Sequence, residues 1–195
     1  MRALAPIVPD NVAAGVGNLK VVAYSGTRHG APWVFMDIVE GSYGGRPGKD
    51  GLDAVDTLYA NTRNNPIEDI ESHYPLRVRR YELRDGGAGA GRWRGGLGSI
   101  RDVEFLDEGG FSLEGDGNAI APPGLFGGEP GSPGAVTMNP GTEREDALPS
   151  KLPYRKTRPG DVVRLVGPCG GGYGHPGERD VRAQRRDALD GVTVR

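Results

Sequence analysis

Two glycine-rich turns of this 195-residue chain carry side chains that could act on a polar substrate. The turn at 44–50 contains an arginine and an aspartate among closely spaced glycines, and the turn at 172–175 contains a phenol and an imidazole. A carboxylate or an imidazole can move a proton, while a guanidinium or a phenol can position a carbonyl group. A tight structural turn is the alternative interpretation of each segment. The predicted catalytic residues are Asp50 and His175, and the predicted substrate-binding residues here are Arg46 and Tyr173.

A polar run between two apolar segments adds further candidates. The run Asn61-Thr62-Arg63-Asn64 presents amide, hydroxyl and guanidinium groups within four positions. A guanidinium is planar and can donate two parallel hydrogen bonds to a carboxylate, whereas an amide both donates and accepts. The same groups could instead cap the neighbouring helices. We therefore predict substrate binding by Asn61 and Arg63, with helix capping as the alternative.

Nucleotide and metal motifs fail when their spacing is checked. In a phosphate-binding loop, Tyr43 would have to be glycine and Asp50 would have to be the serine or threonine that holds Mg²⁺. The second glycine turn matches G-x-G-x-x-G but carries Pro176 inside the turn. The three histidines lack metal-binding spacing, and the single Cys169 excludes a disulfide framework and a cysteine zinc site. We expect this chain alone to bind no cofactor and no metal.

Charge and composition limit the possible partners. A formal net charge of -2 gives no electrostatic case for nucleic acid or an anionic membrane surface. The N-terminal residues have no long apolar stretch, which argues against a signal peptide or a membrane span, so we expect a cytoplasmic location. The 34 glycines and 16 prolines are typical of a loop-rich folded domain. Its hydrophobic core should be thin and supplemented by a partner surface.

The elements that must position these residues are short. Segments rich in Val, Ile, Phe and Trp between Gly/Pro turns predict strands, and their spacing favours antiparallel pairing. Helical spacing of apolar residues predicts helices at 52–60 and 66–74, the second capped by Asn65, and a charged helix at 178–190. The polar stretch 143–156 is predicted to be a surface loop. The predicted strands are 19–25, 33–40, 76–83, 99–106, 111–114, 135–138 and 161–166.

The predicted fold class is therefore α+β and β-rich, with antiparallel strands, short helices and many Gly/Pro loops. The length is that of one domain or one and part of another. We divide the chain into an irregular entry at 1–18, a core at 19–177 and a charged C-terminal helix or tail at 178–195.

Four motifs follow one another along the chain. They are GSYGGRPGKDGLDAVDTLYANTRNNPIEDIESHYPLRVRRYELR, GGAGAGRWRGGLGSIRDVEFL, PPGLFGGEPGSPG and GDVVRLVGPCGGGYGHPGERD. In this order they resemble the hydantoinase B/oxoprolinase family, which includes the B subunit of N-methylhydantoinase, the matching half of 5-oxoprolinase and a subunit of acetone and acetophenone carboxylases. The resemblance spans residues 6–179 and concerns the C-terminal portion of the family's B subunits. One departure is that His175 stands where the family's usual GGGYGDP run has an acid.

The resemblance implies ATP-dependent chemistry on a cyclic amide or a ketone carbonyl. An A-type ATP-binding partner subunit would phosphorylate the substrate oxygen, and the B subunit would complete ring opening or carboxylation. Glycine-lined backbone dipoles could then steady a developing oxyanion. ATP and a divalent metal are implied for the full complex, and a separate N-terminal B half, expected to carry the family's His/Asp metal-ligand motif, is a further implied partner.

The expected function is therefore a part of an ATP-dependent cyclic amide hydrolase of the 5-oxoprolinase or hydantoinase type. A fragment of an ATP-dependent ketone carboxylase and a non-catalytic structural remnant are the alternatives.

Overall fold

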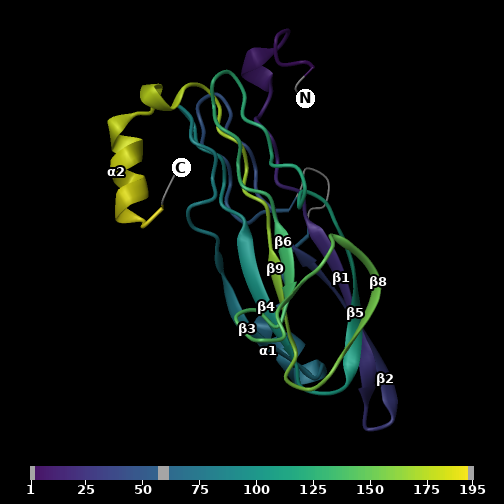
Figure 1. Ribbon diagram of the computed structural model, residues 1–195. Coiled ribbons are helices and arrows are strands. Elements are labelled where there is room, and N and C mark those ends of the chain that lie inside the picture. Colours follow the sequence, from purple (N-terminus) through teal and green to yellow (C-terminus); the bar gives the residue numbers. More distant parts are fainter. Residues whose placement is uncertain (1–2, 57–61, 193–195) are drawn as a thin grey trace.

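The computed structural model describes residues 3–56 and 62–192, and it shows a two-layer β-sandwich with a bundle of extended segments at one end (Figure 1). The first sheet has the strand order β2-β1-β5-β8, and the second sheet has the order β3-β4-β9-β6-β7. These neighbouring strands are all antiparallel, which confirms the predicted β-rich α+β class. The strands are β1 (Lys20–Arg28), β2 (Ala31–Val39), β3 (Leu76–Leu83), β4 (Ser99–Phe105), β5 (Gly109–Gly115), β6 (Ala135–Met138), β7 (Asp146–Ala147), β8 (Lys151–Thr157) and β9 (Val162–Val166).

Two α-helices lie outside the sheets, α1 (Ile67–His73) and α2 (Val181–Leu189). Asp180 caps α2, because its carboxylate accepts hydrogen bonds from two backbone N–H groups of the first turn. The predicted cap of α1 by Asn65 is wrong, since Pro66 occupies the cap position and no side chain caps this helix. Within the described part of the chain, no helix is both long and apolar enough to cross a lipid bilayer. The described residues also include two 3-10 turns, η1 (Pro9–Asn11) and η2 (Pro176–Glu178).

The predicted helix at 52–60 is wrong over 52–56, and its remainder lies outside the described residues. Val55 instead forms an antiparallel bridge with Gly41, and the Ala54 N–H donates to the Leu97 carbonyl at 2.7 Å. Ala54 also has a φ of 40°, in the left-handed region that interrupts a right-handed helix. Long-range backbone hydrogen bonds therefore replace local helical ones in this segment.

The predicted surface loop at 143–156 is also wrong, because it contains β7 and most of β8. β8 pairs with β5 at the edge of the first sheet, with a register shift between Phe111 and Leu113. Most of its side chains are exposed, whereas Leu152 packs against the core. An edge strand pairs on one side only, so a polar sequence can still form it.

The hydrophobic core lies between the two sheets and is rich in aromatic rings. Tyr24 of β1 lies 6.0 Å from Phe35 and 5.9 Å from Phe105, measured between ring centroids. Tyr74, which follows α1, stacks on Phe35 at 4.8 Å and so seats α1 against the sandwich. The buried core residues are Val22, Tyr24, Phe35, Val39, Ile70, Leu76, Val103, Phe105, Phe111, Leu113, Val136, Met138, Val163 and Leu165.

Above the sandwich in Figure 1, extended segments that are not strands run side by side. Backbone hydrogen bonds join them: the Gly45 N–H donates to Gly171 at 2.9 Å, that of Gly171 to Gly15 at 2.9 Å, and that of Gly170 to Gly96 at 2.9 Å. The main chain therefore satisfies its polar groups without a regular sheet. We call this assembly the glycine bundle, and its segments are 12–17, 41–52, 86–98, 122–134 and 167–174.

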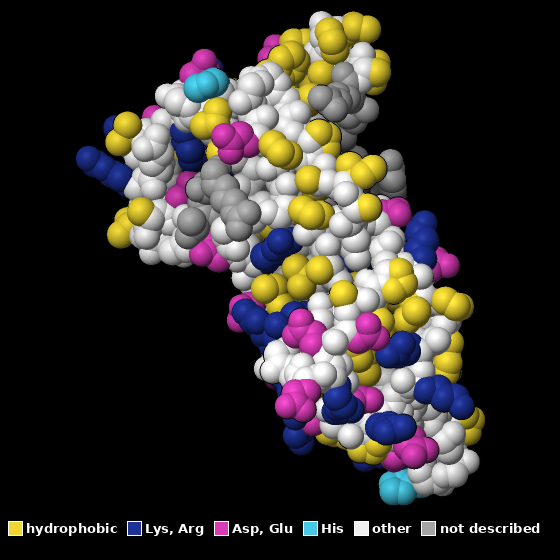
Figure 2. Space-filling view, viewed as in Figure 1, with side chains coloured by type: hydrophobic (Ala, Val, Ile, Leu, Met, Phe, Trp, Pro, Cys, Tyr) yellow, Lys and Arg dark blue, Asp and Glu magenta, His cyan; other side chains and the backbone are white. Residues whose placement is uncertain are grey.

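Glycine is required in the glycine bundle because neighbouring backbone occupies the place of a side chain. A Cβ atom on Gly95 would lie 1.8 Å from the carbonyl oxygen of Gly170, and one on Gly131 would lie 1.9 Å from that of Cys169. Collagen chains need glycine at their shared axis for the same reason. Figure 2 shows large white areas, which are backbone and uncharged polar side chains, over this end, while charged side chains crowd the sandwich.

A charged cluster is buried between the two sheets. The Arg101 guanidinium of β4 donates to Asp37 of β2, lies 3.7 Å from a Glu40 carboxylate oxygen and covers the Tyr81 ring at 4.1 Å. Arg101, Asp37 and Glu40 are 3%, 7% and 4% exposed. Burial works to lower the pKa of Arg101, but the two carboxylates outweigh it and raise that pKa. We call these four residues the Arg101 cluster.

Lys20, at the start of β1, is a fully buried cation. Among the described residues its ammonium makes no hydrogen bond, and neither does the Asn118 amide oxygen. A Cβ atom on Gly134 would lie 2.5 Å from the ammonium and 3.0 Å from that oxygen, so both groups face the glycine. Burial, aided by the positive charge of Arg84, lowers the pKa of Lys20 from 10.5 to about 8.

We predict that Lys20→Met stabilises the protein in a pH-dependent way. With a folded pKa of about 8 and an ordinary value of 10.5, the folded state binds fewer protons than the unfolded state between these values. The wild-type free energy of unfolding therefore rises with pH across this window. The gain from Lys20→Met should be about 3 kcal/mol at pH 7 and should shrink towards pH 10. Urea unfolding at both pH values checks this, with exposed Lys156→Met as the control. A gain that is equal at both pH values would contradict the prediction.

Candidate functional site

Four of the six predicted site residues lie at the end of the glycine bundle that carries α2. Tyr173 is in the segment that pairs with Trp93 through mutual backbone hydrogen bonds of 3.0 and 2.9 Å. Its ring lies 5.7 Å from that of Trp93 and 5.2 Å from that of Phe126, and its hydroxyl donates to the Pro9 carbonyl at 2.8 Å. Tyr173 is therefore held rigidly, with its hydroxyl already engaged by the N-terminal segment.

Asp50 lies beside this segment but is fully engaged by cations and backbone. Its two carboxylate oxygens accept from the Arg179 guanidinium at 2.8 Å each, and one also accepts from the Arg94 N–H at 2.8 Å. Burial works to raise the pKa of Asp50, but Arg179 and the Arg94 N–H outweigh it and hold that pKa below its usual value. The carboxylate is therefore ionised and held in place, an arrangement that suits anchoring a neighbour better than accepting a proton.

The same charges dock α2 against the glycine bundle. Asp187 of α2 accepts from Arg179 at 2.7 Å and from the Arg94 guanidinium at 3.1 Å, and Arg94 also pairs with Asp53 at 3.0 Å. None of the α2 residues is buried, so no hydrophobic seam holds this helix. In Figure 1, α2 accordingly projects from the side of the bundle. Its position depends on a chain of ion pairs.

We predict that Asp50→Asn releases α2. The amide keeps the shape but removes the charge that Arg179, whose side chain is 7% exposed, needs as a partner. Hydrogen bonds to charged groups contribute about 1.5–3 kcal/mol, so hydrogen exchange over 178–190 should accelerate at least tenfold.

Because the pKa of Asp50 is lowered, the wild-type docking is complete at pH 5 and above and is lost as pH falls through the lowered value. Mass spectrometry of exchange at pH 7 measures this, with Asp190→Asn at the end of α2 as control. Unchanged exchange in Asp50→Asn would contradict the prediction.

His175 is exposed and lies beside a glycine turn. Its Nδ1 accepts from the Gly177 N–H at 3.0 Å, so that the proton of the neutral ring is on Nε2. Phe126, which has a φ of 49°, is 49% exposed, and the neighbouring Gly127 faces the His175 backbone. Arg92 covers the Trp93 ring at 4.7 Å. An exposed surface with a proton donor, a cation and an aromatic ring is thus built around His175.

Arg46, Asn61 and Arg63 are the remaining predicted site residues. The side chain of Arg46 is exposed, and the backbone of its turn is closed by mutual 3.0 Å hydrogen bonds between Arg46 and Lys49. The exposed Arg63 precedes Asn64, whose amide donates to the Tyr81 hydroxyl of the Arg101 cluster at 2.6 Å. No described contact brings Arg63 to the surface around His175. Asn61 lies outside the described residues.

Several glycine N–H groups of the glycine bundle are already occupied and are not free to steady an oxyanion. Those of Gly45, Gly51, Gly89 and Gly96 donate to carbonyl groups of neighbouring segments at 2.8–3.0 Å. In the part of the chain that the structure describes, no three His, Cys, Asp or Glu side chains form a group that could hold a metal ion. We assign the described residues no step through ATP or a metal.

Cys169 lies inside the glycine bundle. Its sulfur accepts from the Gly98 N–H at 3.3 Å, and burial raises the pKa of the thiol. A protonated and buried thiol is a poor nucleophile.

The partners that organise this surface could not be identified from the sequence. Arg179, which pairs with Asp50, is 129 positions away, and no local pattern connects them. Trp93 and Phe126 flank Tyr173 from two other segments. An aromatic residue within two positions of a glycine in each of the three segments was the available signal. We call Arg92, Phe126, Tyr173 and His175 the His175 surface; Arg92, Phe126 and His175 are exposed, and Tyr173 is buried beside Phe126.

Comparison with known proteins places these features in one family. The family model described as Hydantoinase B/oxoprolinase matches residues 1–176. A protein of Pseudomonas sp. (strain NS671), named as the B subunit of a D-/L-hydantoinase, is 60% identical over 196 residues, which cover 100% of this chain and 33% of that protein. A 5-oxoprolinase of Dictyostelium discoideum is 29% identical over 72% of this chain and 11% of its own length.

The fold is shared with a solved enzyme structure. The ATP-dependent caprolactamase from Pseudomonas jessenii superposes with a TM-score of 0.84 over 97% of this chain and 35% of that chain, at 23% identity. The chain therefore spans about a third or less of the length of these relatives. The family match and the 60% identity show that the chain belongs to the hydantoinase B/oxoprolinase family.

Proposed function

We propose that this chain is a part of an ATP-dependent cyclic amide hydrolase of the hydantoinase or 5-oxoprolinase type. The observation that supports this most is the 60% identity, over the whole chain, to a protein named as the B subunit of a D-/L-hydantoinase. Hydantoins, 5-oxoproline and caprolactam, the compounds in the names of its relatives, are all cyclic amides. Ring opening of a cyclic amide is therefore the proposed reaction class.

We propose that the chain acts together with an ATP-binding A-type subunit and the remaining portion of a B-type subunit. ATP and a divalent metal would be held by those partners. This chain would contribute the His175 surface to a shared site. There the Nε2–H of neutral His175 could donate a hydrogen bond to the carbonyl oxygen of the substrate, while the rigidly held Tyr173 and the cation of Arg92 flank the same surface.

The role of Asp50 is proposed as support of this surface. Arg179, which it binds, follows directly after η2 and also donates to the Arg92 carbonyl at 3.4 Å. Through Arg179, Asp50 thereby connects η2 and Arg92, which flank His175, to the glycine bundle. Arg46, Asn61 and Arg63 keep their proposed substrate-binding roles, with Arg46 as the candidate at this end of the molecule.

Reconstitution with the A-type subunit and the remaining B portion tests the proposal. ATP-dependent opening of hydantoin, 5-oxoproline and caprolactam would be measured by chromatography of the ring-opened acid, for this chain alone and for the mixture. We expect turnover in the mixture only. In the mixture, His175→Ala should lower kcat by about 10²-fold. His73→Ala, an exposed histidine on α1, should leave it unchanged.

The alternatives give different results in the same assay. Turnover that requires acetone and bicarbonate would assign the chain to a ketone carboxylase, the enzyme class of the nucleotide-free acetone carboxylase structure, which has the same fold with a TM-score of 0.73. Absence of turnover on every substrate would favour a non-catalytic structural remnant.

A further inference from the structure

The two outer faces of the sandwich differ sharply in chemistry. On the second sheet, outward carboxylates pair with arginines of neighbouring strands: Arg79 donates to Glu104 at 2.9 and 2.6 Å, and Arg164 donates to Asp102 at 2.7 and 2.6 Å. Arg77 lies 3.6 Å from the same Glu104. Such a cross-strand carpet of ion pairs is suited to contact with water.

The outer face of the first sheet is apolar instead. Since Val22 and Tyr24 of β1 point into the core, their neighbours Val21 and Ala23 must point outward. Their register partners on β2 are Ile38 and Met36, and Val34 follows on the same side. Val34 and Met36 are 67% and 66% exposed. We call this group the apolar face: Val21, Ala23, Val34, Met36 and Ile38.

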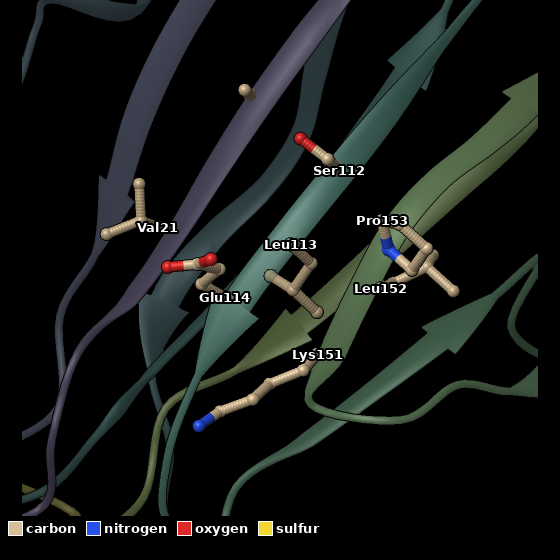
Figure 3. A pocket seen from close by; sticks show the side chains of 8 residues that line it. Val21, Ser112, Leu113, Glu114, Lys151, Leu152 and Pro153 are labelled. Atoms are coloured by element: carbon tan, nitrogen blue, oxygen red, sulfur yellow. The ribbon is translucent and has the colours of Figure 1, made fainter.

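A groove deepens the apolar face between β1, β5 and β8. It has a volume of about 480 Å³, and Figure 3 shows Val21, Ser112 and Pro153 bordering it from three strands. Glu114 and Lys151, which are register partners, lie together at one end of the groove. An apolar floor with a charged rim is the usual composition of a protein–protein interface.

A water-exposed sheet normally alternates apolar and polar residues, and the second sheet of this protein does so. Contiguous exposed apolar groups on the first sheet therefore indicate a face that another protein surface covers. Extension of the sheet at β8 is disfavoured, because Pro153 lacks an N–H and charged side chains line this edge. At the β8 edge, we therefore expect the partner to pack on the face and not beside the strand.

We propose that the apolar face receives the remaining two-thirds of a hydantoinase B-type subunit. The 60% identical relative contains this whole chain within 33% of its length, so its other part is about twice as long as this chain. A second observation concerns the inner face of the first sheet. Among the described residues, this face packs against the second sheet and forms the one apolar core cluster that both sheets share. Thus the first sheet would be the central layer between the second sheet and the rest of the subunit. The inference rests on the proposed function in taking the chain as part of a B-type subunit.

The experiment uses this full chain and, as probe, the part of the Pseudomonas sp. (strain NS671) relative that lies outside the matched third. Binding would be measured by biolayer interferometry for wild type, Met36→Glu and the matched variant Leu83→Glu on the second sheet, where Leu83 is 48% exposed. We expect Met36→Glu to weaken the affinity at least tenfold and Leu83→Glu to leave it within twofold. Both side chains are exposed in this chain, so both variants should keep the wild-type melting temperature.

Methionine oxidation gives an independent footprint. Met36 should be oxidised rapidly by dilute peroxide in this chain alone and be protected at least fivefold when the probe is added. Met138, which is 3% exposed in the core, should oxidise slowly in both samples and serves as the internal standard.

Three results would overturn the proposal: no binding by wild type, equal binding by wild type and Met36→Glu, or self-association of the chain that Met36→Glu abolishes, which would make a second copy the occupant. The proposed function fails separately. If Met36→Glu weakens binding of the probe but no cyclic amide is opened, the proposed function alone is wrong. If a cyclic amide is opened and Met36→Glu changes neither this turnover nor the binding, this inference alone is wrong.

Discussion

Gly95→Ala should prevent the protein from accumulating in a folded, soluble form. The new Cβ would lie 1.8 Å from the Gly170 carbonyl oxygen and 2.3 Å from its carbon, and both atoms belong to backbone held by hydrogen bonds on the other side. A flexible side chain could turn away, but a carbonyl that is fixed within the glycine bundle cannot. We expect a loss of at least about 3 kcal/mol, the upper part of the range for overpacked cores. Soluble yield and the urea midpoint measure it.

Two other glycines separate steric overlap from the general effect of replacing glycine. Gly177→Ala would meet only the exposed His175 side chain, at 3.1 Å, and should cost little. Gly30→Ala meets nothing within 4 Å but has a φ of 80°, so it should cost about 1 kcal/mol through backbone strain alone. A Gly95→Ala protein as stable as Gly30→Ala would show that the bundle segments can separate, which contradicts the structure.

Arg101→Met should destabilise the sandwich by about 3–5 kcal/mol, because it leaves two carboxylates buried without their cation. Asp37 and Glu40 are 7% and 4% exposed, so water cannot replace the guanidinium in the folded state. The Tyr81 ring would also lose the cation that covers it at 4.1 Å. Thermal unfolding at pH 7 monitored by circular dichroism measures the loss.

Neutralising the carboxylates is the control for this interpretation. The triple variant Arg101→Met, Asp37→Asn, Glu40→Gln should recover most of the lost stability, since no charge is then left unpaired. A triple variant as unstable as Arg101→Met would assign the loss to packing of the arginine stem and not to charge.

Much of the sheet structure could be predicted because its signals are local. The strands at 76–83 and 135–138 match β3 and β6, since turn residues bound short runs suited to strands there. The helix at 52–60 could not be corrected from the sequence. Its apolar spacing is helical, but Gly51 lies where a Cβ would meet the Tyr43 oxygen at 2.0 Å, and the Tyr43 N–H donates to the Leu52 carbonyl. A distant segment decides that conformation.

The candidate site was predictable in position but not in its contacts. Tyr173 and His175 were candidates because both lie in a glycine turn; the structure leaves His175 exposed, whereas Tyr173 is buried with its hydroxyl bound to the Pro9 carbonyl. The state of Asp50 depends on Arg179, and the Arg101 cluster joins β2, β3 and β4. Such contacts exist only after the chain has folded, so charge type alone could not reveal which residues are free to react.

The division between sandwich and glycine bundle has a consequence for temperature. Unfolding the sandwich exposes the larger apolar core and raises the heat capacity, whereas unfolding the bundle exposes a smaller apolar cluster together with many peptide groups, whose hydration lowers it. The heat-capacity increment per residue should thus fall below the usual value of about 12–15 cal/mol/K. Cooling weakens the hydrophobic sandwich while the hydrogen-bonded bundle persists. The two ends of this molecule should therefore fail at opposite extremes, the sandwich first in the cold and the bundle first in the heat.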